Sequence, residues 1–416
     1  MQIPMQKSVQ KKAVLSTTIA IDSERSVFHF YSMEGNDQRT ITHYVKRYTG
    51  RLFDDNFFKK FKSAVKEYSA SLPSETVRKV TVVIPDRVVL TDIIRIPTMQ
   101  GFGQTRKTLS VTLESIYRNF QDLRGGSHVL DQNKQYSIFA VTAVQKHFVS
   151  PIYSICSENK MLVDTLAYEA GTAVTGAQMI NPRLKNTSYL FLDLKENYTR
   201  CVFVSKGKPS GFYKLPFGAG LLRRSEVVAE ETLFDRSYAD LAVMRAKEQA
   251  KSDSEPEENE ERTDLFNGHR DSASIIMGSP YEIVEKPPRE IPEALRREIP
   301  VTAAGVRYEN FRIFAKWAMS LIQSNERIVD VACPEFVCVN LPEDLADVID
   351  KFNDENRDDL AKEEQSRAEG DDTKKKKPTV LPFVRVASDG ANVNIVANLE
   401  LYGGLFSKMI SPTGTL

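Results

Sequence analysis

Apolar and polar positions along the chain follow two different periodicities. Short apolar runs rich in β-branched residues are typical of buried strands, and they occupy 13–22, 26–31, 80–85, 88–96 and 136–144. Stretches with an apolar residue every three or four positions predict amphipathic helices, and they occupy 53–70, 105–120, 146–159 and 306–324. Strands and helices that alternate in this way predict an α/β protein whose parallel or mixed sheets are flanked by helices.

The stretch from Ser188 to Gly220 carries the most specific pattern. An apolar run ends in the acid Asp193, a second β-rich run follows a polar turn, and Lys206-Gly207-Lys208 has the composition of a tight hairpin. The stretch closes on Gly218-Ala219-Gly220, just before residues that read as a helix. The run 13–22 repeats the first part of this pattern, since it ends in Asp22 before a turn and a second strand.

Taken in this order, the motifs resemble the PilM/FtsA branch of the actin-like ATPases, with PilM, a cytoplasmic type IV pilus assembly protein, as the closer match. The resemblance covers nearly the whole chain outside two charged segments. It implies an α/β, actin-like (ribonuclease H-like) two-lobe fold with an inserted extra subdomain of the PilM/FtsA type. Within that subdomain we expect a turn at Gly125-Gly126 between the helix 105–120 and the strand 136–144.

By this resemblance, several residues would surround Mg-ATP if nucleotide binding is retained. Asp22 would approach the metal, although an acid that closes an ordinary hairpin is an equal alternative. The helix acid and lysine Asp240 and Lys247 lie two helical turns apart and would meet the nucleoside, with a solvated helix as the alternative. The full nucleotide set is Asp22, Asp193, Lys195, Thr199, Gly218, Gly220, Asp240, Lys247 and Asn340.

Three turns depart from the family pattern because they lack glycine where backbone should approach the ligand. The first holds Ser23-Glu24-Arg25, the second holds Lys195, and the third holds Asn340-Leu341-Pro342. Glu24 also places a carboxylate where a triphosphate is expected, and like charges repel at short range. Together the three departures favour a protein that has kept the fold and has lost or weakened ATP binding, and we assign no catalytic residue.

Composition narrows the class of protein. The 416 residues include 56 basic and 56 acidic side chains, so overall charge points to no nucleic-acid partner. No apolar run approaches the length of a membrane-spanning helix, and the first residues are no secretory signal, so we expect a cytoplasmic protein.

The cysteines stand singly in apolar surroundings and are expected to be buried thiols: Cys156, Cys201, Cys333 and Cys338. None of the five histidines is assigned to a metal.

The expected organisation follows from these elements and from two shifts in composition. Residues 251–303 and 353–378 are acidic, proline-rich or lysine-rich and are expected to be disordered. The chain is expected to begin with a basic tail (1–12), followed by the first lobe (13–97), the inserted subdomain (98–160) and a return to the first lobe (161–185). The second lobe follows in two pieces (186–250 and 304–352), and a C-terminal part (379–416) packs back on the second lobe.

The leading functional hypothesis is a PilM-like scaffold of a type IV pilus or type II secretion-like assembly platform. Its partner would be the short cytoplasmic tail of a PilN-like inner-membrane protein, gripped near 105–120 and 136–144, with self-association also open. Membrane contact would be peripheral at the inner face of the cell membrane. The block Lys374–Lys377 reads as a solvated loop, or it could meet anionic lipid or an acidic partner. The alternative is a functional actin-like protein that binds ATP and Mg²⁺, either polymerising or FtsA-like.

Overall fold

The computed structural model describes residues 14–34, 40–72, 77–99, 101–117, 119–228, 302–329, 335–341, 343–357, 382–386 and 399–406. They fall into two compact units. The first unit combines 1–187, 202–212 and 386–416, and the second combines 188–201 and 213–385. The expected basic tail, residues 251–301 and most of 353–378 lie outside the described residues, although a helix continues through Glu355. At the end of the first segment expected to be disordered, Ala303 already begins a helix.

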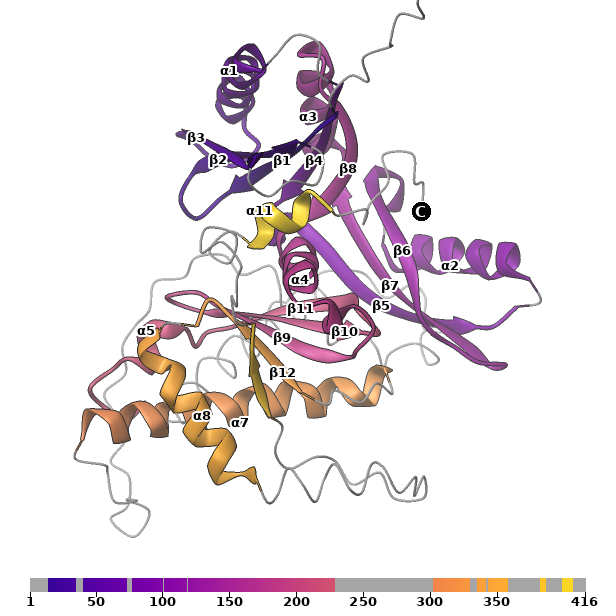
Figure 1. Ribbon diagram of the computed structural model, residues 1–416. Helices are drawn as coiled ribbons and strands as arrows, with labels where there is room; N and C mark the ends of the chain where they lie inside the picture. Colours follow the sequence, from indigo (N-terminus) through magenta and orange to yellow (C-terminus); the bar gives the residue numbers. More distant parts are fainter. Residues whose placement is uncertain are drawn as a thin grey trace, which may run out of the picture. The chain divides into compact units, whose positions relative to one another are not determined.

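A five-stranded mixed sheet forms the centre of the first unit, with the order β3-β2-β1-β4-β8 (Figure 1). β1 pairs antiparallel with β2, and β2 with β3, whereas β1, β4 and β8 run parallel. The strands are β1 (Val14–Asp22), β2 (Val27–Glu34), β3 (Thr42–Arg47), β4 (Val77–Ile84) and β8 (Leu162–Tyr168).

Helices α1 (Asp55–Ser71) and α3 (Lys146–Glu158) cover one face of this sheet, and α4 (Glu169–Ile180) and α11 (Leu399–Gly404) cover the other (Figure 1). The carboxylate of Asp54 caps α1 by accepting a hydrogen bond from the Phe57 amide at 2.6 Å. The inward stripe of α1 is buried against Phe28 of β2. Each fully buried phenylalanine in such a stripe contributes about 2–3 kcal/mol.

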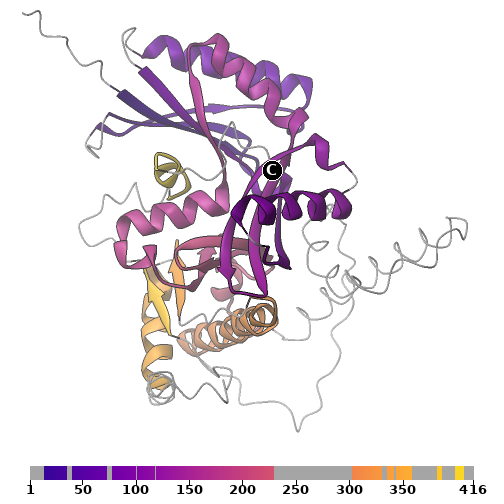
Figure 2. The same cartoon turned by 90° about the vertical axis from the view of Figure 1, so that its right-hand side faces the viewer.

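A separate three-stranded antiparallel sheet, with the order β5-β7-β6, is inserted between β4 and β8 (Figure 2). Its strands are β5 (Val89–Pro97), β6 (Leu123–Gln132) and β7 (Tyr136–Gln145), and α2 (Phe102–Ile116) packs on one face. The sheet therefore begins before the expected boundary at 98. It corrects one prediction: Gly125 and Gly126 lie inside β6, where a Cβ at Gly125 would be 2.1 Å from the Thr142 carbonyl oxygen of β7. The two strands approach too closely there for a side chain.

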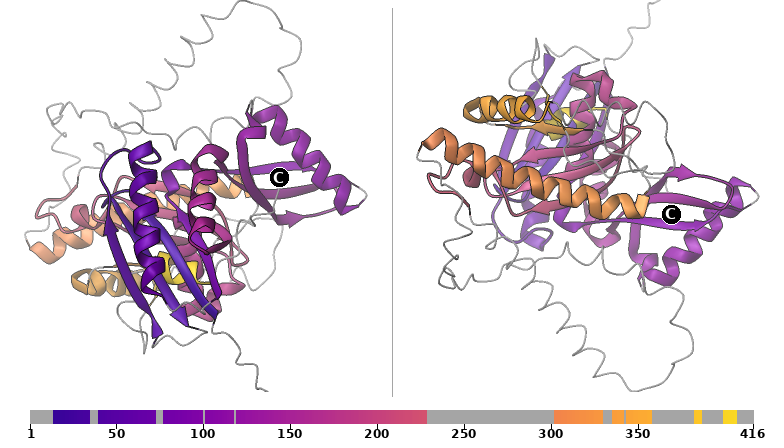
Figure 3. Two further views of the ribbon diagram at one scale, coloured as in Figure 1. Left: turned by 90° about the horizontal axis from the view of Figure 1, so that it is seen from above. Right: turned by 90° about the horizontal axis from the view of Figure 1, so that it is seen from below.

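The second five-stranded sheet has the order β11-β10-β9-β12-β13. β9, β12 and β13 run parallel, and the tight Lys206-Gly207 turn, with φ values of 49° and 76°, joins β10 to β11 as predicted. Helices α5, α7 and α8 belong to the second unit, and α7 is the long helix in the view from below (Figure 3, right). The elements are β9 (Tyr189–Leu194), β10 (Thr199–Ser205), β11 (Lys208–Leu215), α5 (Ala219–Leu222), α7 (Ala303–Val329), β12 (Phe336–Val339), α8 (Ala346–Glu355) and β13 (Phe383–Arg385).

Both five-stranded sheets have the same topology. When the strands of each sheet are numbered by their order along the chain, their spatial order across the sheet is 3-2-1-4-5. A duplicated sheet of this topology is the ribonuclease H-like arrangement expected of an actin-like protein, so the predicted fold class is confirmed. The buried state of Cys156, Cys201 and Cys338 is confirmed as well, whereas Cys333 lies outside the described residues.

The C-terminal helix α11 packs on the first unit, whereas the sequence analysis expected the second lobe. Small residues make this contact. A Cβ at Gly403 would lie 1.8 Å from the Thr172 carbonyl oxygen of α4, and a Cβ at Gly404 would lie 2.4 Å from the Thr18 side chain of β1. The glycines therefore let α11 sit directly against α4 and β1.

Candidate functional site

Asp193 occupies the carboxyl end of β9 and is 0% exposed. β12 runs parallel to β9 with Val339 opposite Asp193, so the next residue, Asn340, lies beside the acid. The Asn340 side-chain amide donates a hydrogen bond to Asp193 Oδ1 at 2.6 Å. Asn340 has φ 54°, the left-handed conformation that glycine adopts most easily, and asparagine tolerates it better than most residues. The turn that lacks glycine has therefore kept a glycine-like backbone.

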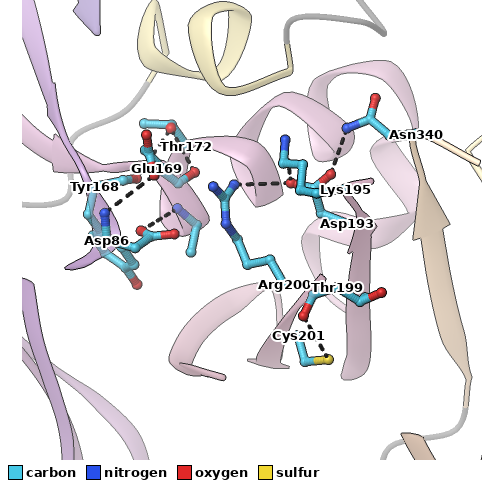
Figure 4. Close-up of polar contacts among 11 residues, drawn as sticks. Asp86, Tyr168, Glu169, Thr172, Asp193, Lys195, Thr199, Arg200, Cys201 and Asn340 are labelled. Carbon is cyan, nitrogen blue, oxygen red and sulfur yellow. Dashed lines mark hydrogen bonds and ion pairs between the residues drawn. The ribbon is translucent and has the colours of Figure 1, made fainter. Parts of the chain in front are cut away.

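Two cations hold the other oxygen of Asp193 (Figure 4). Arg200 Nη1 lies 3.0 Å and Lys195 Nζ lies 3.1 Å from Asp193 Oδ2. The Arg200 side chain is only 3% exposed, whereas that of Lys195 is 26% exposed. A Mg²⁺ ion prefers carboxylate oxygens and water, and two cations on the same carboxylate oppose a third. The residues around Asp193 therefore do not fit a bound Mg²⁺ ion.

The turn after β9 folds onto the glycine-rich segment that follows β11. The amides of Ala219 and Gly220 donate to the carbonyl oxygens of Lys195 and Glu196, both at 2.9 Å. The Thr199 hydroxyl donates to the Phe217 carbonyl oxygen at 2.6 Å. The Gly220 amide and the Thr199 hydroxyl, which belong to residues that the resemblance assigns to the nucleotide, thus bind the chain itself.

Gly218 and Gly220 have a packing role in this turn. A Cβ at Gly218 would lie 2.5 Å from the Glu196 carbonyl oxygen and 2.5 Å from the Tyr198 amide nitrogen. A Cβ at Gly220 would lie 2.9 Å from the Glu196 side chain. Both glycines therefore allow the two segments to close on each other.

In the first unit, Asp22 closes the hairpin between β1 and β2. Its Oδ1 accepts hydrogen bonds from the amides of Glu24 and Arg25, both at 2.9 Å, and Oδ2 lies 3.6 Å from His29 Nε2. Burial raises the pKa of Asp22, but the hydrogen bonds from His29, Arg25 and Glu24 outweigh it and bring the pKa below its usual value. This geometry is that of an acid that stabilises a hairpin turn.

Asp86 and Glu169 are polar residues of the first unit that the sequence analysis did not select. Asp86, 1% exposed, follows β4 and accepts a hydrogen bond from the Ala170 amide at 2.9 Å (Figure 4). The Glu169 carboxylate accepts from the Asp86 amide at 3.3 Å. Asp86 therefore caps the start of α4, and an acid directly after a buried strand was the available clue.

Of the predicted set, the structure brings Asp193, Lys195 and Asn340 into direct contact, and it adds Arg200, which the sequence analysis missed. Asp240 and Lys247 lie outside the described residues. Within the described residues, no group of three or more His, Cys, Asp or Glu side chains could hold a metal ion. No helix in the described part of the chain is long and apolar enough to cross a membrane.

No protein-family model and no curated protein matches the chain. Among solved structures, it is similar to the PilM–PilN type IV pilus biogenesis complex at 11% identity, with 94% of this chain and 96% of the other covered and a TM-score of 0.48. It is also similar to the cytoplasmic domain of EpsL, an inner-membrane component of the type II secretion system of Vibrio cholerae, at 10% identity, 51% and 76% coverage and a TM-score of 0.32.

A third similar structure is a Bacteroides thetaiotaomicron protein of unknown function with an actin-like ATPase fold, at 12% identity, 57% and 78% coverage and a TM-score of 0.30. At such identities a likeness concerns the fold alone. The order and direction of the strands in the two five-stranded sheets are what assign this chain to the actin-like fold.

Proposed function

We propose that the chain is a PilM-like adaptor of a type IV pilus or type II secretion-like assembly platform, and that it works without ATP. The observation that carries the proposal is that side chains of the protein itself already surround the Asp193 carboxylate. Arg200, Lys195 and Asn340 all bind its carboxylate, and the neighbouring backbone amides bind the chain. A fold whose nucleotide-facing turn is filled by its own side chains has protein binding as its remaining role.

The partner in this proposal is the short cytoplasmic tail of a PilN-like inner-membrane protein, which places the chain at the cytoplasmic side of that membrane. We assign the tail to the inserted subdomain. Of the segments that the sequence analysis selected, 136–144 forms the central strand β7, whose residues 137–144 are buried. Direct contact with a partner therefore falls to α2 and its surroundings.

Exposed apolar side chains support this assignment. In the described residues, Val111 is 58% exposed, Ile116 is 44% exposed and Met99 is 39% exposed, all on or beside α2. Leu109 and Leu113 bury the opposite side of α2 against the sheet, so Val111 faces away from it. Exposed apolar residues gathered on one segment favour a protein contact.

The test is binding of a fluorescent peptide, made from the cytoplasmic tail of the organism's PilN-like protein, to the purified full chain. We expect binding that Val111→Asp weakens at least tenfold. Val45→Asp is the matched control, because Val45 is 45% exposed on β3 of the other sheet of the first unit. Equal binding by both variants would overturn the assignment to α2, and absence of binding by the unmodified chain would overturn the adaptor proposal.

A further inference from the structure

The outward side of α1 carries four exposed lysines and the exposed acid Asp55, which precedes Lys59 by one helical turn. Lys59, Lys60, Lys62 and Lys66 are all exposed. The buried side of α1 holds Phe57, Phe61, Ala64, Val65 and Tyr68. At 100° per residue, Lys59 and Lys66 point almost directly away from that buried stripe, two helical turns apart, with Lys60 and Lys62 on the flanks.

Few acids neutralise these lysines. Glu67, one of two acids on α1, binds Lys46 of β3 at 2.7 Å and also accepts from the Tyr44 hydroxyl. Lys62 pairs with Glu158 of α3 at 2.7 Å, but both side chains are more than half exposed, so this pair is weak. Lys59, Lys60 and Lys66 take part in no ion pair among the described residues.

Half-buried aromatic rings border the basic face at the start of α1. Phe53 stacks on Phe148 of α3 with ring centroids 4.7 Å apart and also contacts Phe58. Phe53 has φ 63°, a conformation that is unfavourable for a bulky residue, so its surroundings must hold it in place. These half-buried rings leave some apolar surface next to the lysines, and apolar and basic side chains occur together in helices that bind a bilayer surface.

The α1–α3 surface is a broad helical face. The two helices lie side by side, joined by Phe53 and Phe148 at one end and by the hydrogen bond from Ser69 Oγ to the Asn159 carbonyl oxygen at the other (Figure 3, left). The charges are lysines, which attract anions as point charges, whereas specific carboxylate recognition favours the arginine fork. Lysines that attract anions without a fixed geometry suit a surface that carries many equivalent anions, such as lipid headgroups.

We propose that the α1 basic face, defined as Lys59, Lys60, Lys62 and Lys66, docks on the surface of a bilayer that contains anionic lipid. Each lysine near such a surface strengthens binding about fivefold, and salt weakens the attraction because the Debye length is only about 8 Å at physiological ionic strength. The inference rests on the surface of α1 and α3 and requires neither a peptide partner nor a nucleotide. It is compatible with the adaptor role, which also places the chain at a membrane.

The test is co-sedimentation of the full chain with vesicles of phosphatidylcholine and phosphatidylglycerol in a 3:1 ratio. The unmodified chain should bind, and raised salt should release it. The double variant Lys59→Glu/Lys66→Glu should lose at least tenfold in binding. The matched control is Lys134→Glu/Lys185→Glu, which makes the same charge change at exposed positions of the first unit outside α1 and α2 and should bind like the unmodified chain. Lys374–Lys377 stay in every protein, so that block cannot explain a difference.

Three outcomes would overturn the proposal. The first is equal binding to vesicles of phosphatidylcholine alone, and the second is equal loss in the control variant. The third is failure to bind vesicles together with α1-dependent binding of a polyglutamate peptide, which would assign the face to an acidic protein partner. The vesicle assay contains no tail peptide, so its result is independent of the peptide-binding test of the adaptor role.

Discussion

Asp193 and Arg200 form an ion pair of 3.0 Å in which the two side chains are only 1% and 3% exposed. The acid is the second-last residue of β9, and the arginine lies in β10, the next strand of the same sheet. Removing two charges from water costs several kcal/mol for each ion, and this cost is recovered only when both charges are well paired. Lys195 and Asn340 add to the pairing of Asp193.

Arg200→Ala should lower the free energy of unfolding by about 3–5 kcal/mol, because the variant leaves the Asp193 charge buried with less compensation. Urea denaturation followed by circular dichroism measures the change. Arg223→Ala is the control, since Arg223 is 41% exposed and meets Asp344 at 3.4 Å, a surface pair worth less than about 1 kcal/mol. Equal costs for the two variants would show that the buried pair has no special role.

Titration calorimetry should detect no saturable binding of ATP at millimolar concentration, with or without Mg²⁺. The reason is that Arg200 and Lys195 already hold the carboxylate of Asp193, which the resemblance assigns to the nucleotide site. Asp193→Asn should give the same result as the unmodified chain. Tight Mg²⁺-dependent binding that this substitution abolishes would instead establish a functional nucleotide site and remove the basis of the ATP-independent adaptor.

Gly218→Ala should destabilise the second unit by about 1–3 kcal/mol, because the added Cβ would meet the backbone of Glu196 and Tyr198 at 2.5 Å. Gly211→Ala is the matched control, since no atom lies within 4 Å of the Cβ it would add. Thermal unfolding of both variants measures the difference. If Gly218→Ala unfolds at the same temperature as Gly211→Ala, the close packing of the two segments is not needed for stability.

The lowered pKa of Asp22 predicts a pH-dependent contribution to stability. A carboxyl with a lowered folded-state pKa stabilises the protein above its unfolded-state pKa, near 4, and the contribution is lost as the pH falls through the folded-state value. The stability difference between the unmodified chain and Asp22→Asn should therefore be largest above pH 4 and shrink at lower pH. Urea titrations between pH 5 and 2.5 check this.

Strongly periodic elements were predictable from sequence, and weakly patterned ones were not. The stripe of α1 and the buried strands β4 and β7 emerged close to their observed bounds. β3 was missed because Thr42–Arg47 is a mostly exposed edge strand without the apolar pattern of a buried one. The glycines of β6 were taken for a turn, since sequence alone does not show that a neighbouring strand lies too close for a Cβ.

The sequence analysis selected residues that lie together in the candidate site, but it did not predict the contacts between them. Asp193 and Asn340 were selected by resemblance, and the parallel pairing of β9 with β12 puts them together. Arg200 was overlooked, although an arginine inside the apolar run that follows Thr199 has to find a carboxylate if the strand is buried. The hydrogen bonds that close the turn depend on main-chain geometry, which residue types do not determine.

The position of α11 has a consequence for how the chain folds while it is being synthesised. Leu401 and Tyr402 complete the core around Ala20, Tyr31 and Val83 of the first unit. A ribosome must therefore pass Gly404 before the strands made at the beginning of translation can be fully covered. Until then this apolar surface stays open to solvent, and a nascent chain in that state is a natural client for chaperones.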